Sequence, residues 1–310
     1  MPEIAIVQAS PVYNDIGASL DKALTYISKL AGDGVQLIVF GECWLSGYPA
    51  WIDYGLNVAH WDHEPVKLAY QKIFENSISL ESSEIQQLQA AARENEVCIV
   101  IGVNEVILEG RGNGTIFNSL LTINNEGEIA NLHRKLMPTF NEKLIYGLGD
   151  GAGLKVVETP IGKLGGLICW EHWMPLTRQA MHDAAEDIHV AVWPSVKEMH
   201  QVASRHYAFE GRCYVMAAGL NMRVSDIPEG IKLPESLSAN PDQLILNGGS
   251  CIIGPDGKFI VEPVFGETEI IRAKIPDTSE LKKEKMSLSV SGHYQRPDVF
   301  GLTINKKRYF

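Results

Sequence analysis

Short apolar runs and a helical repeat of apolar positions dominate the first forty residues of the chain. Residues 3–9 and 35–40 are runs of the length and composition that form buried strands. The apolar positions between them recur every three or four residues, at Ile16, Leu20, Leu24, Ile27 and Leu30. This spacing predicts an amphipathic helix, and Gly32 with Gly34 supplies its end. Strand, helix and strand in this order predict a β-α-β unit.

The same alternation continues further along the chain. A second helix is predicted over residues 83–95, where Ser83 and Gln86 have capping-box spacing, and it leads into an apolar run at 97–103. Residues 115–133 have the pattern of two strands joined by a turn at 124–127, which predicts an antiparallel hairpin. A sheet system that holds both this hairpin and the β-α-β unit must be mixed.

The second half of the chain repeats strand and helix patterns. The predicted elements are a strand at 165–169, a helix with Pro175 in its first turn and Leu176, Ala180 and Ala184 on one face, a strand at 188–193, a helix at 196–212, a strand at 214–220, and two strands joined by a turn at 254–257. The class is therefore α/β with many strands. No tract of the 310 residues has a linker-like composition, so we expect one domain over residues 1–310.

Charge and hydropathy narrow the classes of function. The formal net charge is −11, which argues against nonspecific nucleic-acid binding, since neutralising phosphates requires a basic surface. The N-terminal segment has no basic region and only a short apolar run, so it does not resemble a signal peptide. No apolar window is long enough for a membrane span. We therefore expect a cytoplasmic protein.

The cysteines favour neither disulfides nor a zinc site. The five are Cys43, Cys98, Cys169, Cys213 and Cys251. They are odd in number and far apart, and no two have C-x-x-C spacing. The sequon at Asn113 is most simply a glycine-rich turn in a chain with no export signal. A metal or a disulfide framework is therefore not expected.

Four polar residues lie at or just after the ends of predicted strands: Cys169 ends one, and Glu42, Lys135 and Ser195 each follow one. Ligand sites in α/β folds gather beyond the carboxyl ends of strands. A thiol nucleophile needs a base that takes its proton and a cation that stabilises developing negative charge. Glu, Lys and Cys can supply these three roles. From the residues alone the alternatives stay open, because a single cysteine is more often a small buried hydrophobic residue, and Glu42 and Lys135 could be ordinary surface charges.

Four segments resemble the nitrilase branch of the carbon-nitrogen hydrolase superfamily. Residues 166–176 (GLICWEHWMPL) are similar to its nucleophile segment. Residues 40–49, with FGE followed by GYP, and residues 133–151, with HRKLMPTFNEK followed by GLGDG, match further motifs in the expected order. Residues 291–298 (SGHYQRPD) extend the resemblance towards the C-terminus. The resemblance therefore covers nearly the whole chain.

The resemblance implies a four-layer α-β-β-α sandwich with two mixed sheets and a catalytic triad of Glu42, Lys135 and Cys169. Glu142 matches a second family glutamate. Trp170, directly after the cysteine, separates this branch from most amidase relatives and favours small organic nitriles as substrates. The expected reaction passes through a covalent thioimidate and a thioester and yields acid and ammonia, with no cofactor or metal.

We further expect a substrate pocket beside the triad. Its expected lining residues are Tyr48, Trp51, Tyr146, Trp170, His172, Pro194 and Ser195. The segment 44–61 is rich in aromatic residues, which either line this pocket and favour aryl or arylaliphatic nitriles, or simply pack on the core. His172 is expected to form a supporting hydrogen bond rather than to bind a metal, and the pair His60 and His63 to be solvated or structural.

Two departures from the family pattern stand out. Tyr146 occupies a position where relatives often carry Trp, which is expected to change the shape of the pocket. The chain ends at Phe310, where many relatives continue into a tail; this argues against long spiral assemblies, while a homodimer or a larger homo-oligomer stays the expectation. The glycine run from Gly147 to Gly153 lacks dinucleotide-binding spacing and is interpreted as a flexible loop.

Two other functions fit the same motifs. An amidase or a cyanide-hydrolysing relative would use the same Glu, Lys and Cys on another substrate. A non-catalytic binding module would keep the fold without the chemistry, and an unreactive Cys169 would favour that reading.

Overall fold

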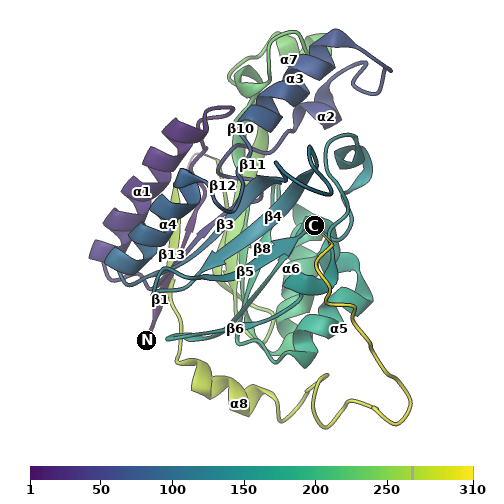
Figure 1. Cartoon of the computed structure of the whole chain (residues 1–310). Coiled ribbons are helices and arrows are strands. Elements are labelled where there is room, and N and C mark those ends of the chain that lie inside the picture. Colours follow the sequence, from purple (N-terminus) through teal and green to yellow (C-terminus); the bar gives the residue numbers. More distant parts are fainter. Residues whose placement is uncertain (267–268, 310) are drawn as a thin grey trace.

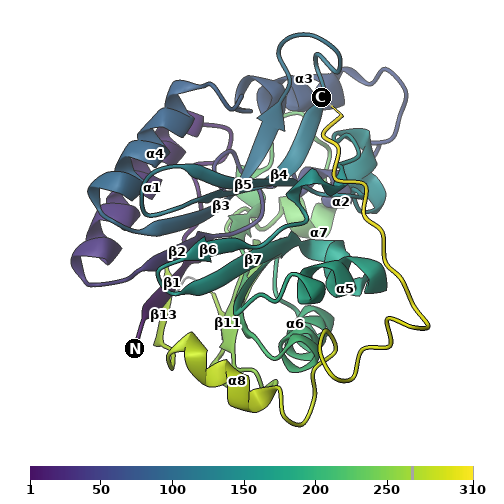
Figure 2. The ribbon, with the colours of Figure 1, turned by 60° about the horizontal axis from the view of Figure 1, so that its bottom comes forward.

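Two mixed β-sheets lie face to face in the computed structural model, and helices cover their outer faces (Figures 1 and 2). The structure describes residues 1–266 and 269–309, so the chain end at Phe310 lies outside the described residues. This architecture confirms the predicted α/β class with two mixed sheets.

The first sheet has six strands in the order β13-β1-β2-β3-β4-β5. Their bounds are β13 (Ile270–Lys274), β1 (Glu3–Val7), β2 (Leu37–Phe40), β3 (Cys98–Val106), β4 (Ile116–Ile123) and β5 (Ile129–Arg134). Strands β1, β2 and β3 are parallel, as the β-α-β pattern predicts, whereas β4 and β5 form the predicted antiparallel hairpin. Strand β13, which the sequence analysis missed, closes the other edge antiparallel to β1.

The second sheet has the strand order β10-β11-β9-β8-β7-β6, and β12 also pairs with β11. Their bounds are β6 (Val157–Thr159), β7 (Gly162–Ile168), β8 (Ile188–Val192), β9 (Tyr214–Ala218), β10 (Asn221–Arg223), β11 (Leu244–Ile253) and β12 (Phe259–Phe265). Strands β7, β8 and β9 are parallel, so their carboxyl ends lie along one edge of the sheet.

Helices form the outer layers. Figure 2 shows α1 (Ile16–Gly32) and α4 (Ser83–Glu94) on the first sheet, and α5 (Pro175–Asp183) and α6 (Glu198–Gly211) on the second. Shorter helices are α2 (Trp51–Tyr54), α3 (Glu64–Glu75), α7 (Glu235–Ser238) and α8 (Leu281–Glu284), and 3₁₀ turns are η1 (Phe140–Leu144), η2 (Gly151–Gly153), η3 (Cys169–Trp173), η4 (Val224–Asp226) and η5 (Thr278–Glu280). Helices α2, α3 and α7 gather at one end of the molecule (Figure 1).

Strand alternation divides the buried side chains between two cores. Ala5 and Val7 of β1 belong to the cluster that includes the buried face of α1, whereas Ile4 and Ile6 belong to the cluster that includes the second sheet. Successive side chains of a strand point to opposite faces, so one strand supplies both cores. The four-layer order follows from this two-sided burial.

Two adjacent glycines in β7 serve the two faces of the second sheet. A Cβ atom at Gly166 would lie 2.8 Å from Leu120 of the first sheet, so this glycine permits close contact between the sheets. A Cβ atom at Gly165 would lie 2.1 Å from the carboxylate of Glu186 and 2.8 Å from Met181 in the outer layer. The strand that leads to Cys169 therefore has no side chain on either face at these two positions.

Two local expectations are wrong. Helix α4 is capped by Ser82, whose hydroxyl accepts a hydrogen bond from the Ile85 N–H, and not by Ser83; Ile85 then occupies the third helical position, so the capping box predicted from Ser83 and Gln86 is wrong. Leu176 of α5 is 68% exposed, because the buried face of this helix is formed instead by Thr177, Ala180, Met181 and His182.

Candidate active site

Cys169 lies where strand β7 turns into η3, and its backbone has φ of 50°. This left-handed conformation is uncommon for a residue other than glycine and costs free energy unless its surroundings hold it. The Cys169 side chain is buried, with 7% of the residue exposed. The thiol is therefore held at a sharp corner at the carboxyl end of a parallel strand.

A buried lysine joins two buried carboxylates in front of this corner. Lys135 Nζ donates hydrogen bonds to Glu42 Oε1 at 2.8 Å and to Glu142 Oε1 and Oε2 at 2.9 and 2.8 Å. Lys135 follows β5 and Glu142 lies seven residues later in η1, whereas Glu42 follows β2, so two distant parts of the chain meet here. The structure thus brings together three of the four predicted catalytic residues by direct contact, and the charge of Lys135 acts on the Cys169 thiol.

Asn118 of β4 restricts the Glu42 carboxylate. Its Nδ2 donates a hydrogen bond of 2.7 Å to Glu42 Oε1, the same oxygen that accepts from Lys135. Glu42 Oε2 is buried and has no hydrogen-bond partner among residues 1–266 and 269–309. One oxygen is therefore fixed by two donors, while the other keeps a free lone pair for a proton.

Burial and nearby charges shift the titration of the cluster. Burial raises the pKa of Glu42 to about 7, although Lys135 opposes the shift. Burial alone would disfavour the charged form of Lys135, but Cys169, Glu42 and Glu142 outweigh it and hold the lysine pKa well above its usual value. Burial raises the pKa of the Cys169 thiol, while Lys135 and the Trp170 N–H oppose the change. At neutral pH the site therefore holds a thiol, an ammonium and a carboxylate poised to accept a proton.

Glu171 ties the nucleophile segment to the lysine segment. Its Oε2 accepts from the Ile168 N–H and its Oε1 from the Leu136 N–H, each at 2.8 Å. His133 Nε2 lies 2.8 Å from Glu171 Oε2. Although burial favours the neutral acid, His133 and these backbone donors lower the pKa of Glu171. The carboxylate therefore fixes the residue before Cys169 relative to the residue after Lys135.

The glycine run after η1 packs tightly instead of forming the flexible loop expected from the sequence. A Cβ atom at Gly149 would lie 2.2 Å from the Arg134 carbonyl oxygen, and one at Gly153 would lie 2.4 Å from His133 Cα. The Gly149 N–H donates to the Lys135 carbonyl oxygen at 2.9 Å. The glycines are therefore required because this segment lies directly on the backbone that carries Lys135.

The predicted pocket residues occupy different positions around the cluster. Tyr48 Oη donates to Glu142 Oε1 at 2.9 Å, which places its ring beside the reactive groups. Trp51 is buried in the core of the first sheet. Tyr146 Oη donates to Asn104 Oδ1 at 2.8 Å and lies 3.5 Å from Cys43 Sγ. The Tyr48 side chain is therefore hydrogen-bonded to a predicted catalytic residue, whereas the Tyr146 hydroxyl is bonded to Asn104.

The remaining predicted pocket residues lie on the side of the second sheet. Trp170 is 47% exposed and is the aromatic side chain adjacent in sequence to the nucleophile. Pro194 is half-buried after β8, and the buried Ser195 hydroxyl donates to the Gly248 carbonyl oxygen at 3.2 Å. His172 is buried beneath Cys169, with Nδ1 2.9 Å from the Cys169 carbonyl oxygen, in agreement with the supporting hydrogen bond expected for it.

The aromatic segment 44–61 does not act as one wall. Trp44 is fully buried and its Nε1 donates to the Ala9 carbonyl oxygen, whereas Trp61 is 98% exposed. Tyr54 Oη donates to the Ile245 carbonyl oxygen. Most of these rings therefore pack the connection around α2 onto the core or face solvent, as the alternative reading allowed.

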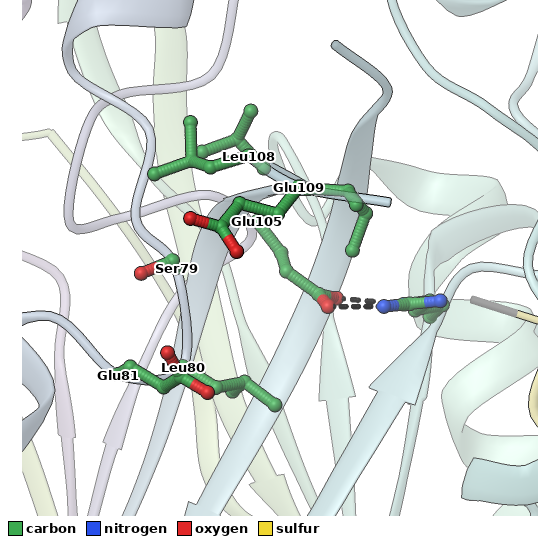
Figure 3. A pocket seen from close by; sticks show the side chains of 9 residues that line it. Ser79, Leu80, Glu81, Glu105, Leu108 and Glu109 are labelled. Atoms are coloured by element: carbon green, nitrogen blue, oxygen red, sulfur yellow. Dashed lines mark hydrogen bonds and ion pairs between the residues drawn. The ribbon is translucent and has the colours of Figure 1, made fainter. Parts of the chain in front are cut away.

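A separate cavity of about 330 Å³ lies on the first sheet, away from the predicted catalytic residues. Figure 3 shows Glu81, Glu105 and Glu109 around it, with dashed lines joining Glu105 to a guanidinium group. That group belongs to Arg134, whose Nε donates to Glu105 Oε2 at 2.9 Å and whose guanidinium lies 4.2 Å from the centre of the Phe117 ring. These contacts hold Arg134, the residue directly before Lys135, in place at the end of β5.

Within residues 1–266 and 269–309, no group of three or more His, Cys, Asp or Glu side chains is arranged to hold a metal ion. Over the same residues, no helix combines the length and apolar character needed to cross a membrane.

Comparison with known proteins places this geometry in a family. Residues 3–283 match the family model described as carbon-nitrogen hydrolase. A protein named nitrilase 2, from an unknown prokaryotic organism, is 39% identical over 98% of this chain and 92% of its own length. An aliphatic nitrilase from Sinorhizobium fredii (strain HH103) is 34% identical over 98% of this chain and 95% of its own length. The crystal structure of XC1258 from Xanthomonas campestris, a CN-hydrolase superfamily protein, has the same fold, with a TM-score of 0.70, 19% identity, and coverage of 98% of this chain and 100% of that chain.

Proposed function

Because the chain belongs to the carbon-nitrogen hydrolase family, we propose that it is a nitrilase, which converts small organic nitriles and two water molecules into carboxylic acids and ammonia. Cys169 is the proposed nucleophile, Glu42 the general base and Lys135 the electrostatic stabiliser. The observation that carries the proposal is the Lys135 ammonium, held between the Glu42 and Glu142 carboxylates with its charge acting on the Cys169 thiol.

The first step is attack of the sulfur on the nitrile carbon. Glu42 takes the thiol proton as the S–C bond forms, and the unpaired Oε2 is the oxygen available for it. Glu42 then gives this proton to the nitrile nitrogen, which yields a neutral covalent thioimidate and restores the carboxylate. A raised pKa suits Glu42 to this role, because a base with a pKa near 7 can both accept and return a proton at neutral pH.

Lys135 and the Trp170 N–H stabilise the charge that develops in this step and the next. Water adds to the thioimidate, and the tetrahedral intermediate expels ammonia to leave a thioester on Cys169. A second water, activated by Glu42, releases the carboxylic acid and restores the thiol. Glu142 holds Lys135 in place through two short hydrogen bonds and is therefore proposed as a positioning residue for the ammonium.

The substrate class and the reaction are tested together with one matched pair of proteins. The parent and Cys169→Ala are incubated with aliphatic, aryl and arylaliphatic nitriles and the corresponding amides, and ammonia, amide and acid are followed. We expect acid and ammonia from nitriles with the parent, and a loss of at least about 10⁴-fold with the variant, because removing a nucleophile eliminates the covalent route.

Other outcomes of this assay separate the competing functions. Turnover of amides alone would identify an amidase, and turnover of cyanide alone a cyanide-hydrolysing enzyme. Equal activity in Cys169→Ala would contradict the proposed nucleophile. The cytoplasmic location and the homo-oligomeric state stay predictions, which cell fractionation and native mass measurement would check.

A further inference from the structure

We propose that a buried chain of three side chains, Glu186, His189 and His172, positions and polarises the peptide group between Cys169 and Trp170. Its role is to aim the Trp170 N–H at the reacting centre as a hydrogen-bond donor. The proposal rests on the proposed function, because an aimed donor speeds turnover only if negative charge develops next to Cys169.

Three consecutive hydrogen bonds connect these groups behind the nucleophile. Glu186 Oε2 lies 2.8 Å from His189 Nδ1, and His189 Nε2 lies 2.9 Å from His172 Nε2. His172 Nδ1 lies 2.9 Å from the Cys169 carbonyl oxygen. All three side chains are buried, so water does not compete for these bonds.

The direction of the bonds follows from the chemistry of their ends. A carbonyl oxygen can only accept, so His172 carries its hydrogen on Nδ1. Burial lowers the pKa of His172 to about 3, so its Nε2 is an acceptor, and His189 must donate from Nε2. Burial raises the pKa of Glu186 to about 7 and lowers that of His189, which favours a shared proton on the carboxyl group. Each group then donates towards Cys169, and such aligned bonds strengthen one another.

The last bond acts on the Trp170 N–H through the peptide plane. In a planar trans peptide the C=O and the N–H point in opposite directions, so fixing the Cys169 carbonyl fixes where the Trp170 N–H points. This N–H acts to lower the pKa of the Cys169 thiol, against the larger effect of burial, which raises it. A hydrogen bond accepted by the carbonyl also polarises the peptide, which makes the N–H a stronger donor. The hydrogen-bonded side chains of Glu186, His189 and His172 therefore hold the left-handed turn at Cys169 in its reactive geometry.

Neighbouring residues hold the side chains of Glu186 and His189 in position. Gly165 pairs with His189 across the parallel strands β7 and β8, and any side chain there would collide with Glu186. Tyr207 Oη donates to Glu186 Oε1, and its ring stacks on His189 with centroids 3.8 Å apart. His182 and Asp187 also face Glu186 and act on its charge. Glu186, His189 and His172 contact one another, and His172 contacts the backbone of Cys169. They are therefore positioning residues.

Paired variants at two positions test the proposal. Glu186→Gln keeps a donor for His189 and an acceptor for Tyr207, whereas Glu186→Leu keeps neither. His189→Phe keeps the stacked ring but removes the donor to His172. His206→Phe is the control, because it makes the same change at an exposed histidine of α6, which lies 3.8 Å from Glu210 and not beside Glu186 or His189.

The expected result is a selective loss of kcat. His189→Phe and Glu186→Leu should lower kcat roughly 10- to 100-fold, less than complete removal of an oxyanion donor, with KM within about twofold. Glu186→Gln and His206→Phe should stay within about threefold of the parent. Wild-type kcat in a folded His189→Phe, or an equal loss in Glu186→Gln and Glu186→Leu, would overturn the proposal. If His189→Phe does not fold, the two Glu186 variants decide.

A substrate-free measurement separates this proposal from the proposed function. The rate of Cys169 alkylation by iodoacetamide reports the thiolate, which the Trp170 N–H stabilises without any nitrile. Alkylation should slow about tenfold in His189→Phe and little in His206→Phe. If the parent hydrolyses no nitrile, the proposed function fails, and the alkylation rates alone support or overturn the positioning role.

Discussion

Two groups of buried polar side chains flank Cys169, and they are built in opposite ways. In front of the thiol, Lys135 holds an ammonium between the carboxylates of Glu42 and Glu142. Behind it, His172 and His189 form a chain of hydrogen bonds in which the histidines are neutral. The front comes from segments that follow strands of the first sheet, and the back from the second sheet.

This difference matches what each side has to do. Charge in front can respond to charge that develops on the substrate, whereas the back only has to hold a peptide group in one orientation. A buried charge is costly when its partner is removed, while a neutral hydrogen-bonded group can be replaced at lower cost. The two sides should therefore differ in their effect on folding as well as on turnover.

The largest expected effect follows from Lys135→Met. It leaves Glu42 and Glu142 buried without their cation, which should lower the free energy of unfolding by about 3–5 kcal/mol and turnover by at least about 10³-fold. Denaturant unfolding and kcat measure the two losses. Lys143→Met, which changes an exposed lysine in the 3₁₀ turn η1 beside Glu142, is the control and should change neither. If Lys135→Met were as stable as the parent, the charged group would cost no more to disrupt than the neutral histidines, and this conclusion would be wrong.

A smaller effect is expected for Glu142→Gln. The amide keeps one acceptor oxygen, but its NH₂ group faces the donors of Lys135 and the Thr139 N–H, so the ammonium should lose its fixed position. Turnover should fall roughly 10- to 100-fold with the fold intact. The neighbouring Asp53→Asn, which removes an exposed carboxylate, should stay within about twofold of the parent. Unchanged kcat in Glu142→Gln would remove this glutamate from the proposed machinery.

The smallest expected effect is the pH dependence that distinguishes the two carboxyl groups. Both Glu42 and Glu186 have pKa values raised by burial to about 7. Glu42 has to be ionised to accept a proton, so kcat/KM should fall as the pH decreases through about 7. Glu186→Gln removes only the second titration. If the acidic limb disappears in that variant, Glu186 and not Glu42 controls the pH profile.

Much of the charged group of Glu42, Lys135 and Glu142 could be predicted from the sequence, because these residues lie in motifs that follow apolar strand patterns. The motifs predict Glu42, Lys135 and Glu142 in one site, and in the structure Lys135 is hydrogen-bonded to both carboxylates. Asn118 was missed, since it lies in the middle of an apolar strand with no local motif. Its meeting with Glu42 depends on the order of β2, β3 and β4 in the sheet.

The group of Glu186, His189 and His172 could not be predicted from the sequence as a whole. His172 was recognised beside the nucleophile, but its partner His189 comes from the next parallel strand, and the register between β7 and β8 decides that they meet. Glu171 lay within the recognised motif, yet its bond to the Leu136 N–H required the two sheets to be placed together. Spacing along the chain carries no information on such contacts between strands.

The paired glycines of β7 limit how this protein can be altered. A side chain at residue 165 has no space while Glu186 is present, and one at residue 166 would meet Leu120 of the opposite sheet. Single substitutions at either glycine should therefore fail, and a library built one position at a time would discard them. Variation at residue 165 becomes accessible only when a smaller residue replaces Glu186 in the same molecule. Positions 165 and 186 therefore have to be diversified jointly in any library that samples this region.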